Sequence, residues 1–279
     1  MPSHLVLSTD NYDSSTGQIY VEFPFQQNFK NTQLAVANLT LYNSFGNVST
    51  VLQNNKISVY WPDGGGHTQF QFTLPDGFYT MKTLNTWLKT QCDENYLYVV
   101  DTTDTKIYPF ILGENTAYNT IIVFRTINQS HTKPTGATWE FPTNTSSRPY
   151  IDFHTTTLSH IFGYSETQIG DGTTSIFENT RVPQPRNVNS LIVCCNLIQD
   201  AKGYSQKSDI LSTIPISANF GSTISRVYPK LEWMNINPNQ YQSLSVQFYD
   251  QNLKRVNLLD PNFLLVLAFR EAPKMNNKK

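Results

Sequence analysis

Apolar and polar residues alternate with a period of two along most of the chain, the pattern of strands that bury one face. This alternation, or an enrichment in β-branched and aromatic residues, predicts strands at 18–25, 32–44, 56–61, 68–74, 96–100, 106–112, 119–127, 189–198, 209–216, 243–250 and 262–270. The last segment is almost continuously apolar, which is typical of a strand buried on both faces. Nine or more strands without a long internal repeat predict an all-β sandwich and argue against a propeller or solenoid.

The segment 32–44 shows the alternation clearly. In a regular strand, successive side chains point to opposite sides of the sheet. One face then carries Leu34, Val36, Asn38, Thr40 and Tyr42, and the other carries Ala35, Ala37, Leu39 and Leu41. The second of these faces is wholly apolar.

One segment departs from the β pattern. Turn residues at 75–77, Pro-Asp-Gly, are followed by Thr80, a favourable N-cap residue, and then by apolar residues at helical spacing. These are Met81, Leu84, Trp87, Leu88 and Cys92. We expect a short amphipathic helix of about three turns. Its residues Leu84, Trp87 and Leu88 should cover an open part of the sandwich, which makes the helix a structural element and not a ligand site.

Residues 128–187 have a different composition. They are rich in Pro, Gly, Asn and Thr around a more compact segment, 157–165, in which a short second helix is expected near 157–162. Loops of this length are uncommon within a compact domain unless they are functional or belong to an insertion. We therefore interpret 128–187 as a long loop excursion or insertion.

The surface predicted from the composition is polar but neutral. Charged residues make up only 15% of the chain, and 20 Lys and Arg stand against 21 Asp and Glu. Such a balance gives no basic field for nucleic-acid phosphates, so DNA binding is not the expected main role. No window approaches the length of a membrane span, and the N-terminus lacks the features of a signal peptide. The three cysteines, two of them adjacent in an apolar run, are expected to be buried free thiols.

No set of residues points to catalysis, a metal or a cofactor. The five histidines stand far apart without metal-ligand spacing, and the glycines at 64–66 lie between two strands, as in a hairpin turn. A cluster of Asp152, His154 and His160 is the one metal site that the spacing leaves open, against an ordinary role as polar loop residues. We therefore expect that the protein is not an enzyme.

Aromatic residues leave a binding role open. Most of the Tyr and Phe residues fall on strand faces, where packing explains them first. Three aromatic residues of the irregular region, Trp139, Phe141 and Tyr150, could instead form a recognition surface that stacks on a sugar.

Seven segments carry a resemblance to a known family. They are LAVANLTLYNSFGNV (34–48), FTLPDGFYTMKTLNTWL (72–88), SHIFGYS (159–165), NSLIVCCNLI (189–198), DILSTIPI (209–216), YPKLEWMNIN (228–237) and SLSVQFYDQNLKRVNLLDPNFLLVLAFR (243–270). Taken in order, they resemble the penton, or minor capsid, proteins of virophages and polinton-like viruses. Each segment is short, and in SHIFGYS the family more often has Leu and Phe at Phe162 and Tyr164.

This resemblance implies a single jelly-roll β-sandwich over residues 1–271, with 128–187 as its excursion and 272–279 as a flexible basic tail. It also implies a homopentamer at the vertices of an icosahedral virion, beside a larger double-jelly-roll major capsid protein. The protein would be made in the host cell without a signal peptide. Contact with nucleic acid would be limited to the basic tail. The alternative is a jelly-roll module of the virion surface that binds a host receptor or glycan.

Overall fold

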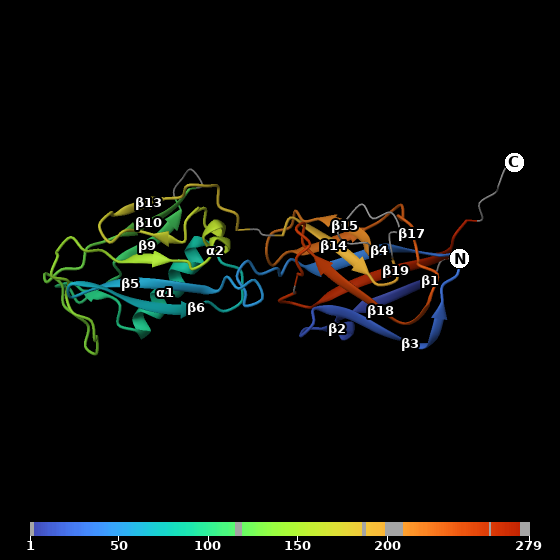
Figure 1. Cartoon of the computed structure of the whole chain (residues 1–279), viewed down its shortest axis with the longest axis horizontal. Helices are drawn as coiled ribbons and strands as arrows, with labels where there is room; N and C mark the ends of the chain where they lie inside the picture. Colours follow the sequence, from blue (N-terminus) through green and yellow to red (C-terminus); the bar gives the residue numbers. More distant parts are fainter. Residues whose placement is uncertain (1–2, 115–118, 186–187, 199–208, 257, 274–279) are drawn as a thin grey trace. The chain divides into compact units, whose positions relative to one another are not determined.

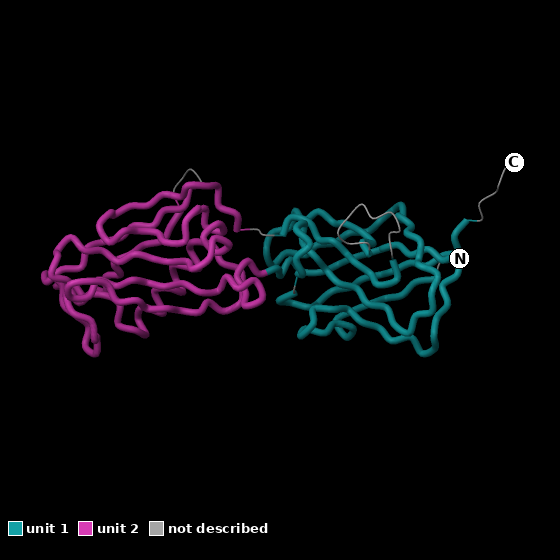
Figure 2. Tube along the Cα trace, in the orientation of Figure 1, with its two compact units in different colours: residues 1–45, 188–279 teal, residues 46–187 magenta. Residues whose placement is uncertain are grey.

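The computed structural model of the chain describes residues 3–114, 119–185, 188–198, 209–256 and 258–273 (Figure 1). The chain forms two compact units: unit 1 consists of residues 1–45 and 188–279, and unit 2 of residues 46–187 (Figure 2). This division differs from the expected single domain over 1–271 with an excursion at 128–187. The inserted unit already begins at Gly46, and it has a hydrophobic core of its own.

The described residues of unit 1 form two antiparallel sheets. The first has the order β1 (Ser3–Ser8), β19 (Phe263–Glu271), β4 (Thr32–Tyr42) and β16 (Thr223–Val227), with β17 (Met234–Asn235) also paired to β4. The second has the order β15 (Ile210–Pro215), β14 (Ser190–Cys195), β18 (Gln240–Tyr249), β3 (Gln18–Asn28) and β2 (Tyr12–Asp13). A single 3-10 turn, Thr9–Asn11, precedes β2.

The pairing of the eight longer strands is that of a jelly roll. In chain order these strands are β1, β3, β4, β14, β15, β16, β18 and β19. The first pairs with the last, the second with the seventh, the third with the sixth and the fourth with the fifth. A long antiparallel hairpin that wraps into two sheets has this order, which defines the jelly-roll fold. The prediction of an all-β jelly-roll sandwich is therefore confirmed for unit 1, where β1 and β19 from opposite ends of the chain lie side by side (Figure 1).

The core of unit 1 is apolar and draws on both sheets. Leu39, Leu41 and Leu265 come from the first sheet, and Val193 and Val246 from the second, all at most 1% exposed. Alternation along each strand places these side chains inward, because every second residue of a strand points to the same face. The space between the two sheets is therefore filled by side chains.

A β-bulge in β4 makes the predicted faces of this strand wrong. Val266 lies opposite Asn38 and the next residue, Leu267, lies opposite Val36, so Ala37 is an extra residue in β4. A bulge reverses the direction of every side chain beyond it. Consequently the inward residues are Leu34 and Val36 before the bulge and Leu39 and Leu41 after it.

The described residues of unit 2 form three antiparallel sheets and two helices. Its four-stranded sheet has the order β12 (Gln168–Ile169), β11 (Tyr150–Asp152), β5 (Lys56–Asp63) and β6 (Gly66–Thr73). The other sheets are β13 (Ile176–Glu178), β10 (Thr120–Phe124) and β9 (Phe110–Glu114), and the pair β7 (Val99–Val100) and β8 (Lys106–Ile107). The helices are α1 (Met81–Glu94) and α2 (Thr156–Ile161). No helix in the described ranges has the length and apolar character needed to cross a membrane.

The predicted helix is present and begins where the sequence indicates. The Thr80 hydroxyl accepts a hydrogen bond from the Thr83 amide at 3.3 Å, and the Thr83 hydroxyl accepts one from the Thr80 amide at 2.8 Å. This reciprocal cap satisfies two amides that the first turn leaves without helical partners. Helix α1 packs against β9, where the side-chain oxygen of Asn85 accepts a hydrogen bond from the Leu112 amide at 3.0 Å.

One face of α1 contributes to the core of unit 2. Leu84 and Leu88 are completely buried there, together with Met81 and Cys92. Trp87 is only half-buried, and its ring meets Phe72 edge-on at a centroid distance of 6.4 Å. The helix is thus part of the packing of unit 2.

Candidate functional site

The residues weighed for a metal site are engaged in local structure. The Asp152 carboxylate accepts a hydrogen bond from the His154 amide at 2.8 Å, and the His154 ring bonds to the Ser58 hydroxyl at 2.7 Å. His160 lies 2.8 Å from a guanidinium nitrogen of Arg181. Over the residues that the structure describes, no three His, Cys, Asp or Glu side chains come together in a way that could hold a metal ion.

The cysteines are buried, and burial makes them poor nucleophiles. Cys92 lies on the buried face of α1, and Cys194 and Cys195 are successive residues of β14. Burial raises the pKa of the Cys92 thiol well above its usual range and raises the pKa of Cys195 to about 12. Since the thiolate is the reactive form, neither thiol is prepared for catalysis at neutral pH.

Two of the aromatic residues considered for recognition, Trp139 and Phe141, belong to the packing of unit 2. Trp139 is 2% exposed, and its indole N–H donates to the Tyr96 carbonyl at 2.8 Å. Its ring lies 5.1 Å from that of Trp61 and meets Phe141 edge-on at 5.4 Å. Phe141 and Tyr150 are half-buried, and Tyr150 stacks on Tyr60 at 4.5 Å. A buried indole offers no face to a sugar, so the structure places Trp139 in the core.

A surface of a different kind lies on the outer side of the first sheet of unit 1. We call it the neutral face and define it by His4, Val6, Ser8, Asn38, Thr40, Tyr42, Thr223, Ser225, Val227, Leu264 and Val266, which lie on the side of the sheet opposite the buried residues Leu7, Leu39, Leu41, Ile224 and Leu265. None of these residues is Asp, Glu, Lys or Arg. The face spans all four main strands of the sheet.

Strand register arranges the neutral face in rows. Val6, Val266, Asn38 and Val227 stand side by side across the four strands. The adjacent row consists of Ser8, Leu264, Thr40 and Ser225. Val6 and Val227 are 58% and 65% exposed, although valine is among the residues most often buried. Exposed apolar side chains gathered on a surface without charges are typical of a protein–protein contact.

Sequence reasoning missed this surface for two reasons. Strands β1 and β16, which supply its two edges, were not among the predicted strands. The bulge at Ala37 then moved Asn38, Thr40 and Tyr42 to the side of the sheet opposite Val36. The signal that could have found β1 is the alternation in its sequence, SHLVLS, where Leu5 and Leu7 point inward.

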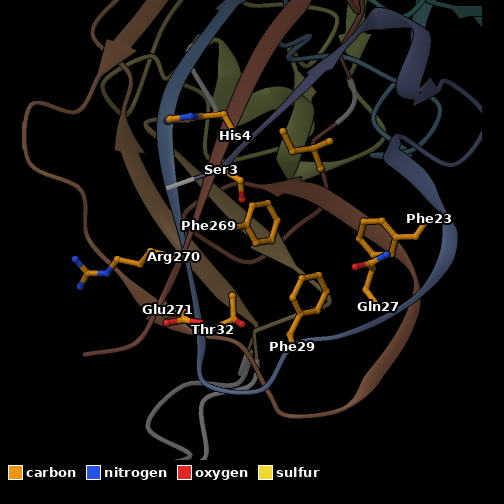
Figure 3. A pocket seen from close by; sticks show the side chains of 10 residues that line it. Ser3, His4, Phe23, Gln27, Phe29, Thr32, Phe269, Arg270 and Glu271 are labelled. Carbon is orange, nitrogen blue, oxygen red and sulfur yellow. The ribbon is translucent and has the colours of Figure 1, made fainter. Parts of the chain in front are cut away.

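Unit 1 also contains an aromatic cavity of about 450 Å³ near the start of β1 and the end of β19 (Figure 3). Phe29 stacks on Phe269 at 5.8 Å and meets Phe23 edge-on at 6.0 Å, and all three line the cavity. At its margin, the Arg270 guanidinium is already engaged, because it donates to Gln33 at 2.8 Å and lies 4.2 Å from the Trp233 ring centre. The cavity therefore has an aromatic wall, with polar residues beside it, among them Ser3, His4, Gln27, Thr32 and Glu271.

No protein-family model matches the chain, and no curated protein sequence matches it. Among solved structures, the chain is similar to the crystal structure of selenomethionine-labelled mavirus penton protein. The TM-score is 0.45 and the sequence identity 10%, over 97% of this chain and 98% of that chain. That protein is of the class that the sequence segments resemble. At this TM-score and identity the match by itself assigns neither fold nor function, which rest on the strand order and surfaces of the chain.

Proposed function

We propose that the chain is a structural capsid protein of a virion and that it has no catalytic role. The observation that carries the proposal is the jelly-roll strand order of unit 1 combined with the neutral face on its outer side. Jelly rolls are found in viral capsid proteins, lectins and cupins, so the fold alone leaves several functions open. The surfaces of this jelly roll narrow the choice.

An enzyme or small-molecule binder with this fold would need polar groups at the place where its ligand sits. The interior of unit 1 is instead packed with leucine, isoleucine, valine and phenylalanine side chains from both sheets. Four exposed apolar residues of unit 1, Val6, Tyr42, Val227 and Leu264, lie together on the neutral face, outside the sandwich. A sheet face that exposes apolar side chains and is defined by uncharged residues is suited to association with other subunits.

We further propose that five copies form a ring at an icosahedral vertex, beside a double-jelly-roll major capsid protein, as the resemblance of the sequence implies. Identical subunits in a ring use one heterologous contact that closes after a full turn. The neutral face could supply one side of this contact without removing charges from water, which is the main cost of burying a charged surface. A neighbour there would also protect the exposed edges of β1 and β16 from uncontrolled strand pairing.

The test is the oligomeric state of the purified full chain, measured by mass photometry and by negative-stain electron microscopy. We expect five-fold rings for the wild type. The double variant Val6→Asp/Val227→Asp should be monomeric, because each aspartate would be buried without a partner, at a cost of roughly 2–5 kcal/mol per site.

Val182→Asp is the matched control, since it makes the same chemical change at a valine of unit 2 that is 81% exposed. This variant should still form rings, and the circular dichroism spectra of all variants should match the wild type. A wild-type chain that is monomeric at all concentrations and does not assemble with a major capsid protein would contradict the vertex role. Rings that persist in the double variant would remove the neutral face from the contact.

Recognition of a host receptor or glycan at the virion surface is a second candidate function, and a pocket of unit 2 with two arginines favours it. Contact of the basic C-terminal tail with packaged nucleic acid stays a prediction. Its lysines, from Lys274 onward, lie outside the described residues.

A further inference from the structure

Unit 2 contains a cavity of about 480 Å³ whose lining combines positive charge, hydroxyl groups and apolar side chains. The residues that matter here are Arg125, Thr126, His131, Arg148, Ser175 and Ile176. Arg125 directly follows β10, Arg148 precedes β11, and Ile176 begins β13, so three separate segments converge. Cavities of roughly 300–1,000 Å³ are the usual size of small-ligand sites.

The two arginines beside this cavity are not neutralised by the part of unit 2 that the structure describes. Ion pairs there join Lys106 to Asp93 and Lys133 to Glu140, and no carboxylate lies within 4.0 Å of either Arg125 or Arg148. A guanidinium stays charged at any pH at which the protein is folded. Two like charges at one cavity repel each other. An anion bound between the two guanidinium groups would be attracted to both and would offset their mutual repulsion.

Arg148 is held in place and still has an unused donor. One of its terminal nitrogens donates to the backbone carbonyls of Ser146 and Thr173. Its Nε is shielded from solvent and has no hydrogen-bond partner in the described parts of the chain. Burying a charged donor without a hydrogen-bond partner costs free energy. A ligand oxygen that accepts a hydrogen bond from this Nε would remove that cost.

The remaining titratable group on the lining is His131. The carboxylate of Asp101 accepts hydrogen bonds from Thr103 and Thr105, and its pKa is lowered mainly by these bonds and slightly by the nearby His131. Asp101 is thus the acidic group that lies near His131 among the described residues. The charge that remains at the cavity comes from the two arginines.

We propose that this cavity binds the oxyanion of an acidic saccharide, with Arg125 and Arg148 as the residues that bind its carboxylate or sulfate group. Guanidinium groups match the geometry of such oxyanions, and the hydroxyls of Thr126 and Ser175 can exchange hydrogen bonds with sugar hydroxyls. Ile176, 56% exposed, offers an apolar edge beside them. A nucleotide fits less well, because Phe124 is 1% exposed and presents no open ring face on which a base could stack. The inference goes beyond the vertex role and does not depend on it.

Isothermal titration calorimetry and saturation-transfer NMR of the full chain would test the site with 3′-sialyllactose, a sulfated lactose and lactose. We expect one or both anionic sugars to bind and neutral lactose not to bind. The comparison of the two anionic sugars shows whether the preferred group is a carboxylate or a sulfate. The affinity should fall as the salt concentration rises.

The informative variant is Arg125→Gln, because Arg125 is exposed and its side chain makes no described contact that supports the fold. It should lower the affinity about 10- to 100-fold, as expected for the loss of a charge-assisted hydrogen bond. Arg148→Gln should abolish binding, but it also removes two contacts to backbone carbonyls. Arg226→Gln, an exposed arginine of unit 1, is the matched control and should leave binding unchanged.

Three results would overturn the proposal. These are no binding of either anionic sugar at millimolar concentration, equal binding of lactose, and binding that Arg125→Gln leaves unchanged while its circular dichroism spectrum matches the wild type. Each of them can occur whether or not the chain forms five-fold rings, so this test and the test of the vertex role fail independently.

Discussion

Truncation of the apolar face of α1 is the most direct test of how unit 2 is held together. Leu84 is completely buried in the core of unit 2, whereas Trp87 on the same helix is half-buried. Removing a fully buried leucine side chain costs about 2–5 kcal/mol, because apolar contacts are lost and a cavity remains. We therefore expect Leu84→Ala to lower the free energy of unfolding of unit 2 by about that amount.

Trp87→Ala should cost less than a buried tryptophan would. Full burial would predict about 3–5 kcal/mol, but the half-buried ring leaves part of its surface in water in the native state. Its edge-on contact with Phe72 adds about 0.5–1.5 kcal/mol. We expect Trp87→Ala to lower the free energy of unfolding by about 1.5–3 kcal/mol in total. This range covers only the lower part of the range expected for Leu84→Ala.

Urea unfolding followed by tryptophan fluorescence measures these effects in the relevant unit. Three of the four tryptophans, Trp61, Trp87 and Trp139, lie in unit 2, and Trp233 lies in unit 1. With a denaturant dependence of about 2 kcal/mol per M, Leu84→Ala should move the midpoint of the main transition down by about 1–2.5 M. Trp61 and Trp139 still report on unit 2 when Trp87 is replaced.

Lys82→Ala is the control, because Lys82 is an exposed residue of the same helix. Its midpoint should stay within the error of the wild type, since surface substitutions usually change stability by no more than about 0.5 kcal/mol. The reasoning would be refuted if Leu84→Ala shifted the midpoint no more than Lys82→Ala does. Helix α1 would then contribute little to the core of unit 2.

Three further predictions concern thiols, acid and backbone strain. In the native protein none of the three buried cysteines should react with Ellman's reagent within minutes, whereas all three should react in denaturant; a fast native reaction would contradict their burial. Hydrogen bonds from neighbouring hydroxyls and amides lower the pKa of Asp13 from 3.8 to about 2, so its stabilising contribution is present above about pH 4 and is lost as the pH falls through 2. An NMR titration should place this midpoint near pH 2, and a midpoint near 3.8 would disprove these contacts. Gly163→Ala should lower the free energy of unfolding by about 1–3 kcal/mol in a thermal unfolding experiment. Gly163 has a φ of +84°, and a Cβ there would lie 2.5 Å from the Arg181 carbonyl oxygen. Gly65→Ala is the control, because a Cβ at Gly65 would meet no atom within 4 Å.

Local pattern was sufficient to predict most elements of the fold. Alternation located β3, β4 and β5, and helical spacing after a threonine cap located α1. These signals work because strand and helix place their side chains with different periods. The pattern was less reliable where an element is short: the predicted strand at 96–100 is reduced to Val99–Val100.

The division into two units could not be predicted in the same way. Both units are built from strands with the same alternation, and nothing in the composition changes at Gly46. The jelly roll of unit 1 depends on pairs such as Ser3 with Phe269, which join opposite ends of the chain. Such pairing leaves no local trace, so only the part of the insertion with an unusual composition, 128–187, was recognised.

Burial in the irregular region was equally hidden. Trp139 stands among prolines, threonines and asparagines, a setting that suggests exposure. In the structure its indole packs against Trp61 from a distant strand and donates to the Tyr96 carbonyl. Both partners are far away in sequence. Only these tertiary contacts show that Trp139 is a core residue and not a recognition residue.

The bulge at Ala37 connects the fold with the proposed assembly. Without the extra residue, regular alternation in β4 would place Asn38 and Thr40 on the same side of the sheet as Leu34 and Val36. The strand would then bury polar groups and expose leucines. With the bulge, the leucines on both sides of it enter the core, and the uncharged polar residues join Val6 and Val227 in the outer rows. One inserted residue therefore produces both an apolar interior and the neutral face through which we propose that the subunits meet.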